Sequence, residues 1–126
     1  MPMTLDGFRR LALSLPDVVE GAHMGHPDFR VGGKIFATLW PKDVLGMVKL
    51  TPEQQQAFVE SEPAVFVPVK GGWGLGGATH VRLEAATLRT LGPAMQTAWR
   101  NAASQGVAVN GAPGAQKPRP RGRKRK

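Results

Sequence analysis

A Gly-Gly pair between two apolar segments is the feature that most limits how this chain can fold. Gly32 and Gly33 separate residues 29–31 from residues 34–40, and both flanking segments are rich in residues typical of strands. Glycine tolerates the positive φ angles of a tight two-residue turn, so the pattern predicts a β-hairpin. A second turn and an apolar segment at residues 44–50 extend the hairpin to a three-stranded antiparallel meander. On alternation, Lys34 is expected to share a face with Phe36, Thr38 and Trp40.

Three helices are predicted around these strands by capping residues and by apolar side chains at helical spacing. They cover residues 4–15, 51–62 and 87–104. Thr51 is the expected cap of the second helix, and Gln54 can complete a capping box with it. Gly92-Pro93 should kink or restart the third helix, because proline lacks the N–H of a helical hydrogen bond.

Three further short strands are predicted, at residues 18–22, 65–69 and 80–84. Pro68 places the middle one at a sheet edge, because proline cannot donate to a neighbouring strand. The Gly-, Pro- and His-rich segments 23–27 and 70–77 are predicted to be loops. The order of helices and strands indicates an α+β fold, with an antiparallel sheet and its helices packed on one face.

Most of the net positive charge lies at the end of the chain. Of the 17 Lys and Arg residues that help give a net charge of +8, seven lie in residues 117–126, which contain no acid. The other ten are balanced by all nine acids within residues 1–116, so the body is close to neutral. Beyond Gly106 the chain is rich in Gly and Pro, and this segment cannot bury enough apolar surface to fold. We therefore expect a folded domain at residues 1–106 and a disordered basic tail at residues 107–126.

Several classes of protein and site are excluded by residues that the chain lacks. Without cysteine it can form no disulfide framework, thiolate nucleophile or cysteine-based metal site. No apolar run approaches the roughly 20 residues of a membrane-spanning helix. The N-terminal residues lack the basic start and apolar stretch of a signal peptide, so we expect a cytoplasmic protein.

Motifs in four parts of the chain resemble those of the MmcQ/YjbR family. They are residues 21–39, residues 47–54, Gly71-Gly72-Trp73-Gly74 and Ala98-Trp99-Arg100, and the resemblance covers about residues 4–105. It implies a compact α+β fold similar to that of CyaY, described as a double-wing arrangement. DNA binding is the function commonly assigned to the family, which offers no catalytic residues to place on this chain. The last helix of relatives looks continuous, whereas Gly92-Pro93 interrupts the corresponding segment here.

Two patterns suggest a metal or a cofactor, and neither has the required context. His23, His26 and Asp28 have the spacing H-x-x-H-x-D, but their Gly- and Pro-containing segment predicts a loop that does not converge them on a metal. The resemblance to CyaY suggests iron, yet the first helix and strand offer only Asp6, Asp17 and Glu20. Residues 72–77 match G-x-G-x-x-G, but a strand pattern follows where a dinucleotide site needs a helix. We therefore expect no metal and no cofactor.

The candidate nucleic-acid contacts are positive side chains near the hairpins and in the tail. They are Arg30, Lys34, Lys49, Lys70 and Arg82 on the domain, and Lys117, Arg119, Arg121, Arg123, Lys124, Arg125 and Lys126 in the tail. An extended arm of this kind can follow a phosphate backbone, and it reads charge rather than sequence. The first hypothesis is a non-catalytic, largely non-sequence-specific DNA-binding protein, with RNA as an alternative partner. In the competing interpretation the domain cations are solvated edge charges, and the tail confers solubility or binds an anionic membrane.

The second hypothesis is a small-molecule or protein-interaction module whose folded domain has no nucleic-acid role. Residues 23–28 and 70–77, together with Trp40 and Trp73, could line a pocket. The three serines lack the G-x-S-x-G context of a nucleophile, so neither hypothesis includes an enzymatic activity.

Overall fold

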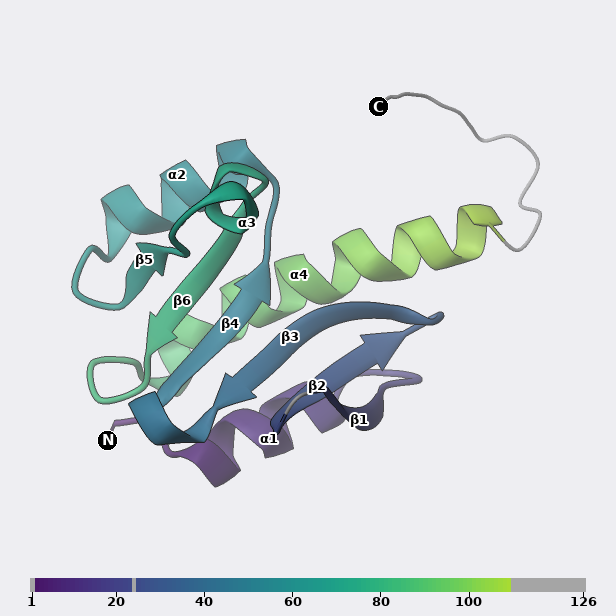
Figure 1. Ribbon diagram of the computed structural model, residues 1–126, viewed down its shortest axis with the longest axis horizontal. Helices are drawn as coiled ribbons and strands as arrows, with labels where there is room; N and C mark the ends of the chain where they lie inside the picture. The colour runs from purple at the N-terminus through teal and green to yellow at the C-terminus, as the bar shows by residue number, and fades with distance from the viewer. Residues whose placement is uncertain (1, 24, 110–126) are drawn as a thin grey trace.

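The computed structural model describes residues 2–23 and 25–109. Within them, six strands form one antiparallel sheet in the order β1-β2-β3-β4-β6-β5 (Figure 1). The strands are β1 (Val19–His23), β2 (His26–Val31), β3 (Lys34–Trp40), β4 (Leu45–Lys49), β5 (Phe66–Pro68) and β6 (Ala78–Arg82). The α+β class and the antiparallel sheet predicted from the sequence are confirmed, and β5, which contains Pro68, lies at an edge.

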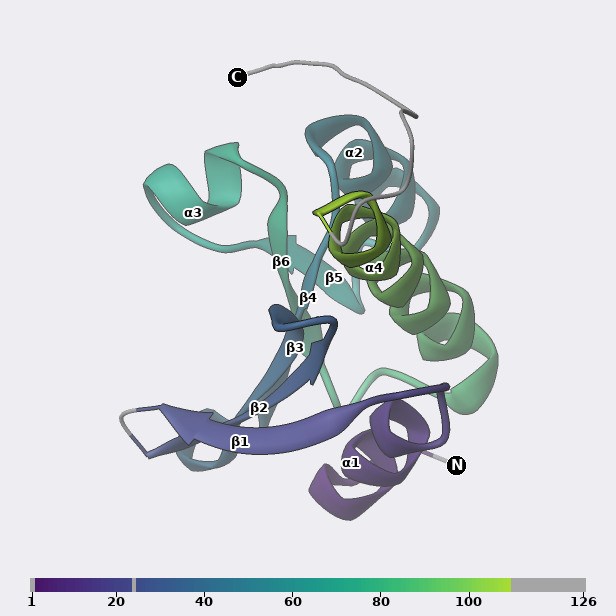
Figure 2. The ribbon, with the colours of Figure 1, turned by 90° about the vertical axis from the view of Figure 1, so that its right-hand side faces the viewer.

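The helices are α1 (Leu5–Leu13), α2 (Pro52–Ser61), the one-turn α3 (Gly72–Leu75) and α4 (Leu88–Val109), with a short 3-10 turn at Pro41–Asp43. As predicted, α1, α2 and α4 cover one face of the sheet, whereas α3 lies over the opposite face (Figure 2). The sequence predicts a loop at residues 70–77, but the centre of that segment forms the turn of α3. In the described part of the chain, no helix has both the length and the apolar character needed to cross a bilayer.

The hairpin of β2 and β3 turns at Gly32-Gly33, as predicted. The two glycines have φ angles of 59° and 81°, in the left-handed region that glycine adopts without strain. The pairing of the two strands then shifts between Phe29 and Arg30 of β2. Such a shift is a β-bulge, in which one strand contributes an extra residue.

The extra residue is Phe36, and it changes the expected faces of β3. Ile35 and Ala37 pair with successive residues of β2, so Phe36 between them has no partner. Phe36 is fully buried in the core, and Ile35 lines the same surface as Thr38. The expectation that Phe36 shares a face with Thr38 is therefore wrong, because a single inserted residue reverses the alternation.

The core lies between the sheet and the two helices α1 and α4. Its largest fully buried side chains include Phe8 of α1, Phe29 of β2, Phe36 of β3, and Leu91 and Met95 of α4. Fully burying one such side chain contributes about 1.5–3 kcal/mol. This packing fixes one face of the sheet as the inner face and leaves the other face available for a site.

α4 is one continuous helix, although it contains Pro93. It begins with reciprocal hydrogen bonds between the main chain and hydroxyl groups of Thr87 and Thr90. The restart expected at Gly92-Pro93 does not occur, and the helix continues past residue 104, where the sequence predicts its end. Proline removes one helical hydrogen bond. Burial of the inner face of the helix offsets that loss, through Leu91, Ala94, Met95 and Ala98.

α3 is held over the sheet by close main-chain packing and by one side chain of α2. Nε2 of Gln55 donates hydrogen bonds to the carbonyl oxygens of Gly74, at 3.0 Å, and Ala78, at 2.9 Å. Gly74 has no room for a side chain, because a Cβ there would overlap the carbonyl oxygen of Val69. Gly74, like Gly77 beside the main chain of Leu50, therefore serves backbone packing, and β6 follows where a dinucleotide site would need a helix.

Replacing Gln55 should weaken the fold by detaching α3 from α2. Gln55→Ala removes two hydrogen bonds, each contributing roughly 0.5–1.5 kcal/mol, so we expect the free energy of unfolding to fall by about 1–3 kcal/mol. Urea denaturation followed by circular dichroism measures this change. Gln56→Ala is the matched control, because exposed Gln56 donates only to the Glu60 carboxylate on the helix surface. Equal losses in the two variants would contradict the role assigned to Gln55.

Candidate functional site

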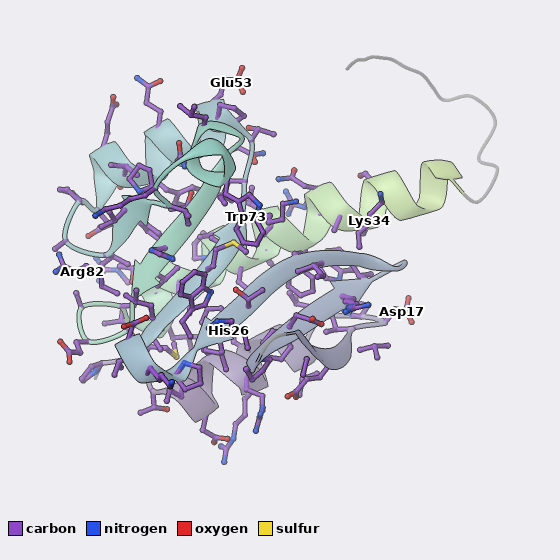
Figure 3. The ribbon with its side chains drawn as sticks, viewed as in Figure 1. Asp17, His26, Lys34, Glu53, Trp73 and Arg82 are labelled. Atoms are coloured by element: carbon purple, nitrogen blue, oxygen red, sulfur yellow. The ribbon has the colours of Figure 1, made fainter. Side chains whose placement is uncertain are left out.

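The face of the sheet that α1 and α4 leave uncovered holds a cavity, which we call the sheet pocket. Its volume is about 320 Å³, within the range of pockets that bind small ligands. Trp73 from α3 and His26 from β2 both lie over this face (Figure 3). β2 and β3 contribute His26, Asp28, Ile35, Thr38 and Trp40. The remaining lining residues are Met47, Lys49, Gly72, Trp73, Gly76 and Ala78.

Cross-strand pairing places the floor residues of the sheet pocket side by side. Met47 of β4 pairs with Thr38 of β3 on one side and with His80 of β6 on the other. Lys49, two residues farther along β4, pairs with Ala78. Alternation puts Met47 and Lys49 on the same face of the sheet. The floor is therefore mainly apolar, with a lysine at one end.

Contacts among three rings fix the aromatic wall of the sheet pocket. The ring centroid of Trp40 lies 4.8 Å from that of His26 and 4.8 Å from that of His80. The His80 ring meets the indole edge-on, with 75° between the ring planes. Nε1 of Trp40 donates a 2.9 Å hydrogen bond to the hydroxyl of Thr38. These contacts hold the indole in one orientation.

The two histidines beside Trp40 are partly buried. Burial lowers the pKa of His80, and the nearby Asp43 carboxylate opposes that shift. Among the described residues, Nδ1 of His26 and Nε2 of His80 are buried without a hydrogen-bond partner. The uncharged form of His80 is therefore favoured near neutral pH, and its ring serves as a packing surface for Trp40.

An ion pair between buried Asp28, which lines the sheet pocket, and partly exposed Arg30 lies on β2. Both carboxylate oxygens of Asp28 accept hydrogen bonds from Arg30, at 2.9 and 3.1 Å, and Asp28 is fully buried. The hydrogen bond and the charge of Asp28 raise the pKa of Arg30. Gly21 of β1 faces this pair, and a side chain there would crowd Asp28. Both oxygens of Asp28 are thus engaged within the protein.

A second cavity of about 550 Å³, which we call the cationic hollow, adjoins the sheet pocket. Arg30, Lys34 and Lys49 line it, so the structure brings together three of the five cations predicted on the domain. α4 also contributes to its lining, through Ala98, Asn101 and Ala102. The two cavities share Ile35, Lys49 and Gly76.

The other predicted nucleic-acid residues are not part of this cluster. Arg82 pairs with Leu45, at the end of β4 opposite Lys49, and it lies across the molecule from Lys34 (Figure 3). Lys70 is exposed in the segment before α3 and lines neither cavity. The seven tail residues Lys117, Arg119, Arg121, Arg123, Lys124, Arg125 and Lys126 lie outside the described residues.

The segment with the H-x-x-H-x-D pattern is more regular than the loop predicted for it. β2 already begins at His26, which pairs with His23 across a turn at Gly25. Pro27 and Asp28, which the sequence pattern assigns to the loop, belong to β2. Among the side chains that the structure describes, which do not include that of His23, no three His, Asp or Glu groups lie close enough together to hold a metal ion.

The second sequence hypothesis proposes a pocket lined by the segments 23–28 and 70–77 with Trp40 and Trp73. In the structure these segments and Trp40 contribute lining residues to one pocket, namely His26, Asp28, Trp40, Gly72, Trp73 and Gly76. Ile35, Met47 and Ala78 are lining residues that sequence reasoning misses. Alternation along β4 and β6 could have indicated the last two. Ile35 reaches the pocket only because of the bulge, which leaves no local signal in the sequence.

The chain is similar to known proteins in its fold and in its sequence family. The crystal structure of the Deinococcus radiodurans protein DR2400, which has a DUF419 domain, matches it with a TM-score of 0.64 and 19% identity. The match covers 77% of this chain and 76% of that chain, and it shows the fold. No curated protein sequence matches the chain. The YjbR family model matches residues 13–101, which hold every residue lining the sheet pocket. As the sequence motifs predict, the chain belongs to the YjbR family.

Proposed function

We propose that the protein binds a small planar ligand in the sheet pocket. The position of Trp73 carries this proposal, because the residue lines the cavity while 63% of its surface is exposed. Removing apolar surface from water is favourable by roughly 25 cal/mol per Å². A flat ligand that stacks on the indole of Trp73 would gain this burial from both partners.

The floor and the wall of the sheet pocket suit a flat ligand. Ile35, Met47 and Ala78 supply an apolar floor, and Trp40 supplies a wall whose orientation is already fixed. Aromatic rings pair favourably with other rings in offset and edge-on arrangements. A concave, mainly apolar cavity with a few placed polar groups is the usual form of a small-molecule site.

The polar groups of the sheet pocket support binding without catalysis. The hydroxyl of Thr38 accepts the hydrogen bond of Trp40. Both oxygens of Asp28 accept hydrogen bonds from Arg30. A catalytic site needs a nucleophile or an acid–base group free to meet the substrate, and these two groups already hold structural positions. The stacking surface of Trp73 carries the proposal, which is therefore of a binding protein and not of an enzyme.

We expect 1-naphthol and similar planar aromatic compounds to raise the melting temperature of the full chain. Trp73→Ala should abolish this rise. One-site binding at a ligand concentration of 100 Kd stabilises a protein by about 2.7 kcal/mol, and the variant loses the stacking surface that produces it. Thermal denaturation with and without ligand measures the effect. Because Trp73 is largely exposed, its replacement should change the stability of the ligand-free protein by less than about 0.5 kcal/mol.

Leu75→Ala is the matched control for this experiment. Leu75 lies on the same short helix and is 82% exposed, but it does not line the sheet pocket. Its replacement should leave the ligand-dependent shift intact. A shift of full size in Trp73→Ala would show that the compounds bind elsewhere.

A second function, contact with nucleic-acid backbones, is favoured by the distribution of charge. Residues 117–126 carry seven of the 17 cations. On the domain, Arg30, Lys34 and Lys49 gather in the cationic hollow, which is lined partly by α4, the helix that precedes the tail in the chain. In this proposal the tail contacts DNA phosphates largely without sequence preference, and RNA is the alternative polyanion.

Deleting residues 117–126 should weaken duplex DNA binding sharply and flatten its salt dependence. If all seven cations engage phosphates, the logarithm of affinity falls with the logarithm of salt concentration at a slope near −6, and the truncated chain should lose most of that slope. Fluorescence anisotropy of labelled DNA and RNA over a salt series measures it. An unchanged slope after truncation would exclude the tail as the phosphate-binding segment.

Lys34→Gln should reduce the magnitude of the salt slope by about 0.9, because one phosphate contact in the cationic hollow is lost. Arg82→Gln is the matched control. Arg82 lies at the end of the β4–β6 pair opposite Lys49 and the cationic hollow, and it lines neither cavity. The same anisotropy titration compares the two variants. If both lower the slope equally, the hollow is not the place where the domain meets phosphate.

A further inference from the structure

We infer that the ligand of the sheet pocket is a planar aromatic group joined to an anionic group, with its ring in the sheet pocket and its anion in the cationic hollow. The inference rests on the proposed ligand-binding function and specifies the chemical class of the ligand. It is carried by the junction of a mainly apolar cavity with a cation-lined one, since the two share Ile35, Lys49 and Gly76.

The shared residues allow one ligand to occupy both cavities. Gly76, at the end of α3, contributes no side chain to the boundary, and a Cβ added there would meet no side chain. Ile35 continues the apolar floor of the sheet pocket up to that boundary. Lys49 belongs to both linings, so its ammonium group can meet an anion bonded directly to the bound ring.

The charge of the cationic hollow favours an anion. Asp28 is the only acid among the described residues that line either cavity, and Arg30 holds both of its oxygens. This pair is close to neutral, so Lys34 and Lys49 determine the charge of the hollow. A local excess of positive charge beside low-dielectric walls concentrates negatively charged ligands.

The N-terminus of α2 borders the cationic hollow but does not supply its anion-binding groups. Thr51 and Pro52 line the hollow. The hydroxyl of Thr51 accepts a hydrogen bond from the main-chain N–H of Gln54, and the side chain of Gln54 accepts one from the N–H of Thr51. Nδ2 of Asn101 also donates to the Gln54 side chain, at 2.8 Å. With these groups engaged, the lysines are the groups to test.

A nucleotide is an aromatic ring joined to an anion, and it can come from two sources. One is a free nucleotide, and the other is an unpaired nucleotide within a single strand. In both, the base can stack on an exposed aromatic side chain while the phosphate meets a cation. A base inside a duplex is stacked on both faces and cannot enter the sheet pocket, so the duplex contacts proposed for the tail do not depend on Trp73.

Isothermal titration calorimetry of the full chain with 1-naphthyl phosphate, 1-naphthol and inorganic phosphate tests the inference. We expect 1-naphthyl phosphate to bind at least about tenfold more tightly than either of the other two, because a charge-assisted contact is added to ring stacking. Lys49→Gln should cost 1-naphthyl phosphate about tenfold in affinity and leave 1-naphthol within about twofold. Trp73→Ala should weaken both compounds.

Lys70→Gln is the matched control, because Lys70 lines neither cavity and the variant keeps the whole tail. It should bind all three compounds as the unchanged chain does. Equal affinities for 1-naphthol and 1-naphthyl phosphate would overturn the inference and leave the proposed function standing. If neither aromatic compound binds, both fall. If Trp73→Ala binds 1-naphthyl phosphate normally, the compound sits outside the sheet pocket and the inference is wrong.

Deoxyadenosine monophosphate and single-stranded oligodeoxyadenylate distinguish the two sources. Oligodeoxyadenylate binding that Trp73→Ala weakens about tenfold would assign the pocket to unpaired nucleotides, as expected for loss of one stacked base. Mononucleotide binding that depends on Trp73, combined with oligonucleotide binding that does not, would assign it to free nucleotides. If neither compound shows binding that depends on Trp73, the nucleotide assignment is overturned.

Discussion

The bulge at Phe36 decides which side chains of β3 meet the helices and which line the sheet pocket. Phe36 packs in the core beside Ala37, and Ile35 therefore joins Thr38 on the open face. In an uninterrupted strand, Phe36 would stand on the pocket floor and Ile35 would turn inward. The bulge persists because Phe36 is fully buried beneath the helices on the inner face. The apolar floor of the pocket is thus a consequence of packing on the opposite side of the sheet.

α3 shows a division between a fixed main chain and free side chains. Gln55 and the contact of Gly74 with Val69 hold its backbone, whereas Trp73 and Leu75 are 63% and 82% exposed. A helix of one turn has no apolar stripe broad enough to bury, so it cannot be held by its own side chains. Because these contacts involve the main chain, the Cα of Trp73 is held in place while its indole remains exposed and can contact a ligand. Because the main chain of α3 is already ordered, only the side chain of Trp73 loses conformational freedom when a ligand binds, which favours affinity.

The local chemistry of the sequence predicts the elements better than it predicts the arrangement that forms the pocket. The turn at Gly32-Gly33, the capping box at Thr51 and the edge strand at Pro68 each follow from a residue with one dominant structural use, and all three are confirmed. The bulge could not be predicted, because it depends on contacts between Phe36 and helices distant in sequence. The unbroken course of α4 through Pro93 depends on tertiary packing in the same way. Opposite charges two residues apart on one strand, such as Asp28 and Arg30, can form an ion pair on the same face. The sequence pattern does not predict this pair, because it places Asp28 in a loop.

The near-neutral charge of residues 1–116 hides a local imbalance that the ion pairs create. Arg9 pairs with Glu20, Arg10 with Asp6 and Arg30 with Asp28. In the described residues, the positive partner of each ion pair is therefore an arginine and not a lysine. Lys34 and Lys49 are left to set the potential of the cationic hollow. Arg30 uses Nε and Nη2 for Asp28, and its Nη1 can still donate a hydrogen bond without adding net charge. An anion there would meet two charges and a third donor, and a phosphate has enough oxygens to accept from all three at once.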